Sequence, residues 1–293
     1  MGFNWPTFRK RALTALVFVA VMLAGLLWDP WSFLALFTLI HFGCWQEYLR
    51  LVELIARVRF HIYLKLGFML VGFGWMLWFC QNGYRIGPYG IRDNLALPVS
   101  AAGFLLLAAG IFVGAALPVR AFAKAALGIV YLSLSWGMLL DLYQYRPLPG
   151  ETAIGIPTGF LPLLVICGIW INDTMAYIVG SLIGRTPFSR ISPKKTWEGT
   201  IGGVVLALAV VAPLFPLVFL GSLSTAMLLL TLPVTAIVAI TGTAGDLLES
   251  KLKRMAGVKD SGAILPGHGG FMDRFDSLLL ATPAVWLWVR CLH

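Results

Sequence analysis

The sequence predicts an all-α fold, that of a polytopic integral membrane protein with about nine transmembrane helices. Its 293 residues are 59% hydrophobic and only 12% charged, and the mean hydropathy of +0.86 lies far above the range of soluble domains. The apolar residues also gather in runs of about 17 to 25, the length that crosses a bilayer as a helix. These runs cover residues 12–28, 30–48, 66–82, 95–118, 122–142, 156–182, 200–220, 226–245 and 275–292.

The first apolar run follows Arg9, Lys10 and Arg11, as the apolar part of a signal peptide would. It has no convincing small-residue cleavage site, however, and more membrane sequence comes directly after it. We therefore expect residues 12–28 to remain in the protein as its first span.

The basic residues favour this number of spans and fix an orientation. With the N-terminus inside, 18 of the 22 Lys and Arg residues fall on the inner side, and only Arg85, Arg92, Arg146 and Arg290 fall outside. Short cytoplasmic loops carry such an excess, so we expect the N-terminus and the charged C-terminal loops on the cytoplasmic face of a bacterial inner membrane. The net charge of +9 then reflects this bias and suits anionic lipids, and no nucleic-acid partner is expected.

The chain divides by chemistry near residue 150. Residues 1–150 hold spans one to five and a few isolated acidic residues near span ends, for which we expect structural roles: Asp29, Glu47, Glu53, Asp93 and Asp141. Residues 151–293 hold spans six to nine, and their stretches 183–199 and 246–276 carry 15 of the charged side chains. We expect catalysis in this second region. The four cysteines form no CxxC pair, so neither a disulfide framework nor a zinc site is expected.

Polar residues of the sixth span form a first cluster, WINDTMAYIVGSLIGR. Asp173 and Tyr177 are spaced four residues apart, so they share a helix face, and Asn172 lies beside them. An aspartate inside a span is costly unless it pairs, binds a cation or faces water. Gly180 and Gly184 follow at the same spacing, and we interpret them as helix-packing positions.

A second cluster, SPKKTWEGTIGG, precedes the seventh span. Ser192 and Pro193 are typical of a helix start, and the positive end of a helix dipole beside Lys194 and Lys195 would attract phosphate. The alternative, that the lysines only mark the inner side of the membrane, stays open on this pattern alone.

The third cluster runs through residues 246–276. Asp246, Glu249, Ser250 and Lys253 share a face where a helix leaves the membrane. After them come Lys259, Asp260, the glycine-rich turn PGHGG, and the pair Asp273 and Asp276, one helical turn apart. Carboxylates that converge with lysines are typical of sites that hold Mg²⁺ against a nucleoside triphosphate.

The same residues carry a family resemblance. From Ser250 to Asp276 the chain reads SKLKR, four residues, KDSG, two residues, LPGHGGF, one residue and DRFD. This run resembles, without a departure, the signature of the phosphatidate cytidylyltransferases, also called CDP-diacylglycerol synthases. SPKKTWEG is a second element typical of that family, whereas the N-terminal half agrees only in having several spans.

The resemblance implies transfer of the cytidylyl group of CTP to phosphatidic acid, which gives CDP-diacylglycerol and pyrophosphate for phospholipid biosynthesis. The partners would be CTP, phosphatidic acid and membrane lipids, and the cofactor Mg²⁺; a second cation and a homodimer are left open. A phosphate oxygen of the lipid is already anionic at neutral pH, so the protein has to position the reactants and neutralise charge and needs no strong base.

Candidate residues follow from the motif. We expect Asp246, Asp260 and Asp273 to hold the metal. The catalytic set is Asp246, Lys259, Asp260, Asp273 and Arg274. The substrate-binding set is Asn172, Asp173, Ser192, Lys194, Lys195, Ser250, Lys253, His268, Gly269 and Gly270. His268 could contact phosphate or brace the loop, and the motif does not decide between these roles.

Two other classes of protein share some of these features. A secondary transporter also has intramembrane acids, but it would place polar residues near the midplane in both halves of the chain. A CDP-alcohol phosphotransferase would carry a DGxxAR element, which this sequence lacks. An enzyme of related chemistry that acts on another lipid phosphate or nucleotide remains the alternative.

Overall fold

The computed structural model describes residues 5–81, 83–114, 117–145, 156–262 and 269–291. The chain forms two compact units. The first unit comprises Met1–Leu140 and Met255–Phe275, and the second comprises Asp141–Arg254 and Asp276–His293. Each unit is described by itself. The residues of the signature thus belong to both units.

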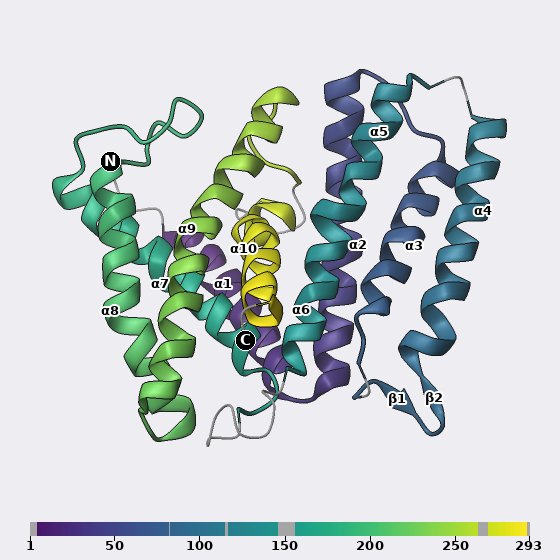
Figure 1. The fold of residues 1–293 in the computed structure, drawn as a ribbon. Coiled ribbons are helices and arrows are strands. Elements are labelled where there is room, and N and C mark those ends of the chain that lie inside the picture. Colours follow the sequence, from purple (N-terminus) through teal and green to yellow (C-terminus); the bar gives the residue numbers. More distant parts are fainter. Residues whose placement is uncertain (1–4, 82, 115–116, 146–155, 263–268, 292–293) are drawn as a thin grey trace. The chain divides into compact units, whose positions relative to one another are not determined.

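The first unit contains helices α1 to α5, the start of α6 and a two-stranded hairpin (Figure 1). Its helices are α1 (Trp5–Leu27), α2 (Pro30–Ala56), α3 (Ile62–Trp78), α4 (Leu97–Val113), α5 (Val119–Gly128) and α6 (Ser135–Tyr143), and its strands are β1 (Arg85–Ile86) and β2 (Tyr89–Gly90). Two π-helical stretches, Arg92–Ala96 and Ile129–Leu134, lead into α4 and join α5 to α6. Aromatic side chains such as Trp45, Phe68 and Trp136 fill the core between these helices.

Helix α2 carries the carboxylate that matters most for the signature loop, and both of its ends are explained by local chemistry. Asp29 caps its start, because the Asp29 carboxylate accepts a hydrogen bond from the Ser32 N–H at 2.6 Å, and Pro30 occupies the first turn. At its end, Arg57 adopts a left-handed conformation with φ 53°. Glu53 accepts from the Phe60 N–H at 2.7 Å and pairs with Lys65, which fixes the turn into α3.

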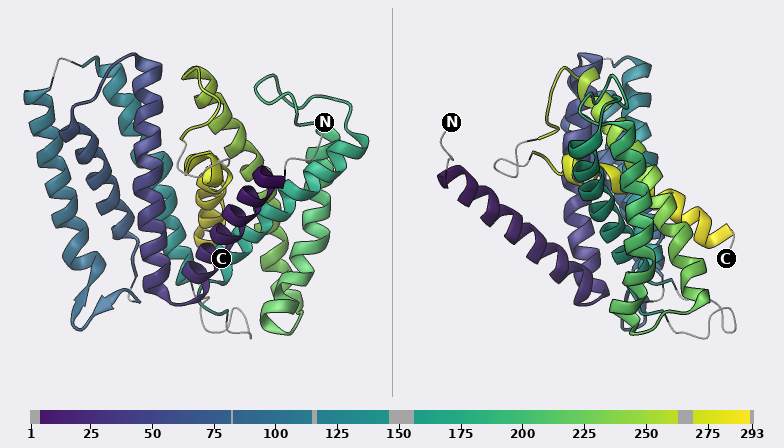
Figure 2. Two further views of the ribbon diagram at one scale, coloured as in Figure 1. Left: turned by 180° about the vertical axis from the view of Figure 1, so that it is seen from behind. Right: turned by 90° about the vertical axis from the view of Figure 1, so that its left-hand side faces the viewer.

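The second unit contains the end of α6, helices α7 (Phe160–Ile183) and α8 (Trp197–Leu220), and most of α9 (Thr225–Met255) and α10 (Met272–Cys291). Figure 2 shows α8 and α9 side by side. Small residues bring α7 and α8 together: a Cβ on Gly203 would lie 2.7 Å from Cβ of Ala176, and one on Gly199 would lie 2.9 Å from Cα of Gly180. These contacts agree with a packing role for Gly180.

All nine predicted spans overlap helices of the structure, and the all-α polytopic membrane fold is confirmed. Among the described residues, five helical stretches are long and apolar enough to cross a membrane: Arg92–Val113, Val119–Tyr143, Phe160–Ile183, Trp197–Leu220 and Thr225–Met255. The chain is therefore an integral membrane protein, and the count of nine spans stays a prediction.

Asp141 is one of the acidic residues that are not isolated, although the sequence suggested that they are. Asp141 was expected to be isolated at a span end, yet it is buried and accepts from the Trp286 indole at 2.7 Å and from the Arg290 Nε at 2.8 Å. Its partners lie about 145 residues further along the chain, so no local pattern could reveal them. Asp141 is an ion-paired residue that ties the end of α6 to α10.

Candidate functional site

A cavity of about 570 Å³ in the second unit brings together several predicted site residues. Helices α7, α8 and α9 line it, together with the loop between α7 and α8. Its predicted members are Asp173, Ser192, Lys194, Lys195 and Asp246. Tyr177, Gly180 and Thr243 complete much of the wall. The volume is that of an ordinary small-molecule site. Asn172 lies beside Asp173 on α7 and is buried.

The loop that carries Lys194 and Lys195 is a closed structure of its own. Its two ends pair, since the Phe188 N–H donates to the Lys195 carbonyl at 2.8 Å and the Trp197 N–H donates to the Thr186 carbonyl at 2.9 Å. The Glu198 carboxylate accepts from the Thr186 hydroxyl at 2.8 Å and from the Thr186 N–H at 3.1 Å. The two lysines are thus held on a braced loop at the cavity.

The predicted helix start at Ser192 and Pro193 is wrong. Helix α8 begins at Trp197, and Thr196 is its cap because the Thr196 hydroxyl accepts from the Gly199 N–H at 3.1 Å. The pairing of the loop ends keeps Ser192 and Pro193 in a turn before the helix. Lys194 and Lys195 therefore precede the cap by one to two residues.

Charged side chains cluster where α9 borders the cavity. Lys195 forms an ion pair with Asp246, and Asp246 also accepts from the Ser250 hydroxyl at 3.3 Å. One turn away, Lys253 pairs with Glu249 at 2.5 Å, and Glu249 is fully buried. Asp246, Glu249 and Lys253 thus share one face of α9, as their three- and four-residue spacing predicts, and Lys195 reaches Asp246 from the preceding loop.

Asp276 of α10 joins this cluster. One carboxylate oxygen from each of Asp246, Glu249 and Asp276 lies within 4.8 Å of the others. A close helix contact makes this possible: a Cβ on Gly245 would lie 2.6 Å from the Asp276 carbonyl oxygen, so only glycine lets α10 come so near to α9. We call Asp246, Glu249 and Asp276 the acidic triad.

The acidic triad has the ligand chemistry that suits a hard divalent cation. Mg²⁺ prefers carboxylate oxygens and keeps part of its water shell, so a few converging carboxylates are sufficient. Such crowded like charges are costly unless a cation or lysine compensates them. The donor set therefore fits a metal ion, with Lys195 and Lys253 next to it.

Only one of the three predicted metal ligands, Asp246, belongs to the acidic triad. Asp260 and Asp273 lie in the first unit, and their grouping with Asp246 stays a prediction. The sequence predicted that Glu249 shares a helix face with Asp246 and that Asp276 lies one turn from Asp273, but neither was named as a ligand. The three-residue spacing from Asp246 to Glu249 was the available signal.

The signature loop, residues 259–271, is described on either side of 263–268. Lys259, Asp260 and Arg274 are exposed, whereas Ser261 and Gly270 are buried. Predicted residue His268 lies outside the described residues. Gly269 has φ 82°, a left-handed conformation that explains the need for glycine in this turn.

Two carboxylates hold the signature loop in the first unit. Asp273 accepts from the Gly270 N–H at 2.7 Å and from the Ser261 N–H at 3.0 Å. Glu47 of α2 accepts from the N–H groups of Phe271 and Met272, each at 2.9 Å. Glu47 is a residue that sequence reasoning did not connect with the site, because its partners lie more than 200 residues away.

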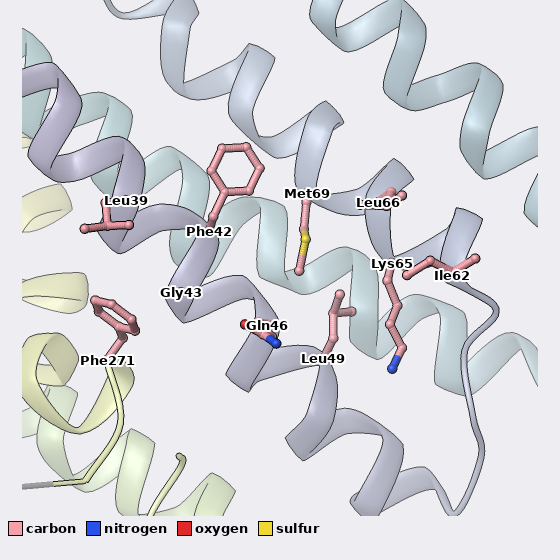
Figure 3. A pocket seen from close by; sticks show the side chains of 10 residues that line it. All are labelled: Leu39, Phe42, Gly43, Gln46, Leu49, Ile62, Lys65, Leu66, Met69 and Phe271. Carbon is pink, nitrogen blue, oxygen red and sulfur yellow. The ribbon is translucent and has the colours of Figure 1, made fainter. Parts of the chain in front are cut away.

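An apolar cavity of about 550 Å³ borders the signature loop in the first unit (Figure 3). It is lined by Leu39, Phe42, Gly43, Gln46, Leu49, Ile62, Lys65, Leu66, Met69 and Phe271. Phe271 faces α2 at Gly43, and a Cβ on Gly43 would collide with its ring. The loop thus contributes one wall of a space that is otherwise formed by α2 and α3.

The fold and the site define a class: a polytopic α-helical membrane protein with acidic and basic side chains converging on a cavity at its C-terminal helices. Residues 9–292 match the model of the cytidylyltransferase family. The chain belongs to this family.

Several similar proteins are named phosphatidate cytidylyltransferases. The chain is 45% identical over 177 residues to a phosphatidate cytidylyltransferase of Thermotoga maritima. The aligned residues make up 59% of this chain and 61% of the relative. It is 50% identical over 117 residues to one of Staphylococcus haemolyticus (39% and 43%), and 49% identical over 119 residues to one of Bacillus subtilis (40% and 43%). The matched part thus spans about half the length of these relatives.

Proposed function

We propose that the protein transfers the cytidylyl group of CTP to phosphatidic acid, which gives CDP-diacylglycerol and pyrophosphate. The observation that carries this proposal is the acidic triad with Lys195 and Lys253 beside a cavity in an integral membrane protein. The names of the relatives supply the substrates. The alternative function, that of a secondary transporter, is not supported, since the charged residues of the site gather on α9, α10 and one loop.

Each group of the second unit then has a role. Lys194 and Lys195 bind phosphate oxygens of CTP, because ammonium groups pair with phosphate and line the cavity. Asp246, Glu249 and Asp276 hold Mg²⁺, which when bound neutralises charge on the triphosphate. Asp173 and Asn172 form the adjoining wall. Lys253 compensates the charge of Glu249, which is buried.

The reaction needs little from the protein beyond position and charge. An oxygen of the lipid phosphate attacks the α-phosphorus of CTP, the bond from that phosphorus to the β-phosphate oxygen breaks, and pyrophosphate leaves. Because the attacking oxygen is already anionic, no residue has to act as a strong base. The roles predicted for Lys259, Asp260, Asp273 and Arg274, and a contact of His268 with phosphate, belong to the same proposal and rest on the motif.

A labelling experiment tests the reaction. Purified protein in detergent is given phosphatidic acid, Mg²⁺ and CTP labelled at either the α- or the γ-phosphate, and the chloroform-soluble product is counted. We expect α-label in the lipid and γ-label in pyrophosphate. Label from the γ-position in the lipid would point to a kinase and contradict the proposal.

We also propose that the site faces the cytoplasm of a bacterial inner membrane, where CTP is present. Single cysteines at Gly257 and at Ser189, in a background without the four native cysteines, should be shielded from a membrane-impermeant thiol reagent in intact cells. A cysteine at position 82 should react. Labelling of the Gly257 position from outside would invert this topology.

A further inference from the structure

Glu47 is a buried carboxylate in the half of the chain that carries none of the predicted catalytic residues. It lies on α2 and is 4% exposed. Its Oε1 accepts from the Phe271 N–H at 2.9 Å, and its Oε2 lies 2.9 Å from the Met272 N–H and 2.7 Å from the Ser261 hydroxyl. All of these donors belong to the signature loop or to the first residue of α10.

The contacts of Glu47 are placed at both ends of the signature loop. Ser261 lies just after Lys259 and Asp260, and Phe271 and Met272 end the loop and start α10. The first N–H groups of a helix have no partner within the helix, so a carboxylate there is also favoured by the helix dipole. One side chain of α2 thus closes the loop and caps the helix that follows.

The glycines of the loop fit the same interpretation. A Cβ on Gly270 would collide with the Glu47 carboxylate, and a Cβ on Gly262 would lie 2.7 Å from its Cδ. Gly43, four residues before Glu47 and on the same face of α2, receives the ring of Phe271 (Figure 3). The loop and this face of α2 are therefore complementary over several residues, and glycine is required at three of them.

We infer that Glu47 is a positioning residue for the proposed reaction: it fixes the signature loop so that Lys259 and Asp260 are presented in one conformation. This inference rests on the proposed function for its catalytic consequence. The anchoring itself rests only on the contacts of Glu47 with Ser261, Phe271 and Met272.

Glutamine is the most specific substitution for testing the hydrogen bonds of Glu47. Both Glu47 oxygens accept N–H groups, so the amide group of Gln would place an NH₂ donor against the donor of either Phe271 or Met272. Glu47→Gln therefore breaks at least one contact at nearly unchanged volume. Glu53→Gln is the matched control, because Glu53 lies on the same helix and also accepts a backbone N–H, from Phe60, outside the signature loop.

The test combines hydrogen exchange with kinetics on the full-length protein in detergent. For Glu47→Gln we expect the peptide that contains Phe271 and Met272 to exchange about tenfold faster, with peptides of α8 unchanged. We expect kcat/KM for CTP to fall about tenfold, mainly through a higher KM for CTP, while the KM for phosphatidic acid stays within about twofold. Glu53→Gln should leave the loop peptide and the kinetics within about twofold of the wild type.

Other outcomes overturn the inference. Unchanged exchange in Glu47→Gln would show that the anchor is wrong, and faster exchange with unchanged kinetics would show that the anchor has no part in catalysis. Equal losses in Glu47→Gln and Glu53→Gln would show a general loss of stability. A wild-type protein without cytidylyl transfer would contradict the proposed function and the catalytic part of the inference. The hydrogen-exchange measurement would still test whether Glu47 anchors the loop.

Ser261→Ala gives a second route if Glu47→Gln does not fold. It removes a hydroxyl that lies 2.7 Å from Glu47 Oε2 and 3.0 Å from Asp273 Oδ2, and it leaves the N–H groups of Phe271 and Met272 in place. We expect the same direction of change, with kcat/KM for CTP reduced about threefold and a raised KM for CTP. Wild-type exchange and kinetics in Ser261→Ala would contradict the anchoring of the loop at its first end.

Discussion

Buried or half-buried carboxylates occur in both units, but their surroundings differ. In the first unit, Glu47 and Asp273 direct their oxygens to N–H and O–H groups of one loop. In the second unit, Asp246, Glu249 and Asp276 gather near one another, with Lys195 and Lys253 beside them.

The partners of these carboxylates explain the difference. A carboxylate that accepts several backbone N–H groups is stabilised by them and fixes the backbone in return. Three carboxylates that share a space of a few ångströms repel one another, and a nearby cation offsets this repulsion. We therefore interpret Glu47 and Asp273 as residues that hold the signature loop, and the acidic triad as metal ligands. Five substitutions test this distinction, in order of decreasing expected effect.

Asp246→Asn should have the largest effect. It keeps the volume of the side chain but removes a charge that holds a hard cation and pairs with Lys195, so we expect cytidylyl transfer to fall by about a hundredfold or more. The measurement is the rate of labelled lipid formation over a range of Mg²⁺ concentrations, with gel filtration to show a folded protein. Near-normal turnover with unchanged Mg²⁺ dependence would contradict the ligand role.

Asp260→Asn distinguishes two predictions: that Asp260 is a metal ligand, as the family motif implies, and that the acidic triad alone holds the ion. If Asp260 is a metal ligand, it should match the loss seen for Asp246→Asn. If the triad alone holds the ion, the loss of activity in Asp260→Asn should be smaller than in Asp246→Asn. Asp276→Asn should then show the same loss as Asp246→Asn. The same Mg²⁺ titration decides between these outcomes.

Gly262→Ala should lower activity about tenfold, since its Cβ would meet the Glu47 carboxylate and displace the loop. If the acidic triad alone holds the ion, the substitution should not change the Mg²⁺ concentration that gives half-maximal rate, because the three triad carboxylates stay in place. In a Glu47→Ala background the added methyl group has room, and we expect almost no further loss. A full tenfold loss in both backgrounds would show that Gly262 does not act through Glu47.

Lys195→Ala should weaken binding of the nucleotide more than it slows the chemical step. An ammonium group binds phosphate oxygens, so we expect the KM for CTP to rise about tenfold with kcat changed less. Lys65→Ala is the control, because Lys65 also pairs with a carboxylate but in the first unit. A loss of kcat at unchanged KM would instead give Lys195 a role confined to the transition state.

Asp141→Asn should affect activity least, within about threefold, because Asp141 belongs to neither set of carboxylates. It should nevertheless lower the free energy of unfolding by about 2 kcal/mol, since it weakens the pairing with Arg290. Thermal unfolding in detergent, measured beside the transfer rate, checks both expectations. A large loss of activity at unchanged stability would extend the site to α6.

The sequence was most informative where a contact is local. The helices follow from apolar runs, and the alternation of Asp246, Glu249 and Lys253 follows from the period of a helix. One cavity is lined by Asp173, Lys194, Lys195 and Asp246, which the sequence predicts as site residues, and their roles stay predictions. These predictions needed only spacing along a helix and the chemistry of phosphate.

Contacts between distant parts of the chain could not be predicted. Asp276 joins the acidic triad because Gly245 lets α10 approach α9, and a pattern within one helix does not contain this approach. Glu47 looked like one more charge at a span end until Ser261 and Phe271 were found beside it. The helix start at Thr196 was missed because pairing between residues 186–188 and 195–197 decides it.

The distance along the chain between Glu47 and Ser261, 214 residues, has a consequence for biosynthesis. At about 5 to 20 residues per second, α2 leaves the ribosome roughly 10 to 45 s before its hydrogen-bond donors exist. During that interval Glu47 has to remain hydrated or paired elsewhere, since a carboxylate without a partner is unfavourable in the bilayer. Docking of the loop on α2 is therefore a late assembly step, and in a chain that stops before residue 261 Glu47 would lack all of these donors.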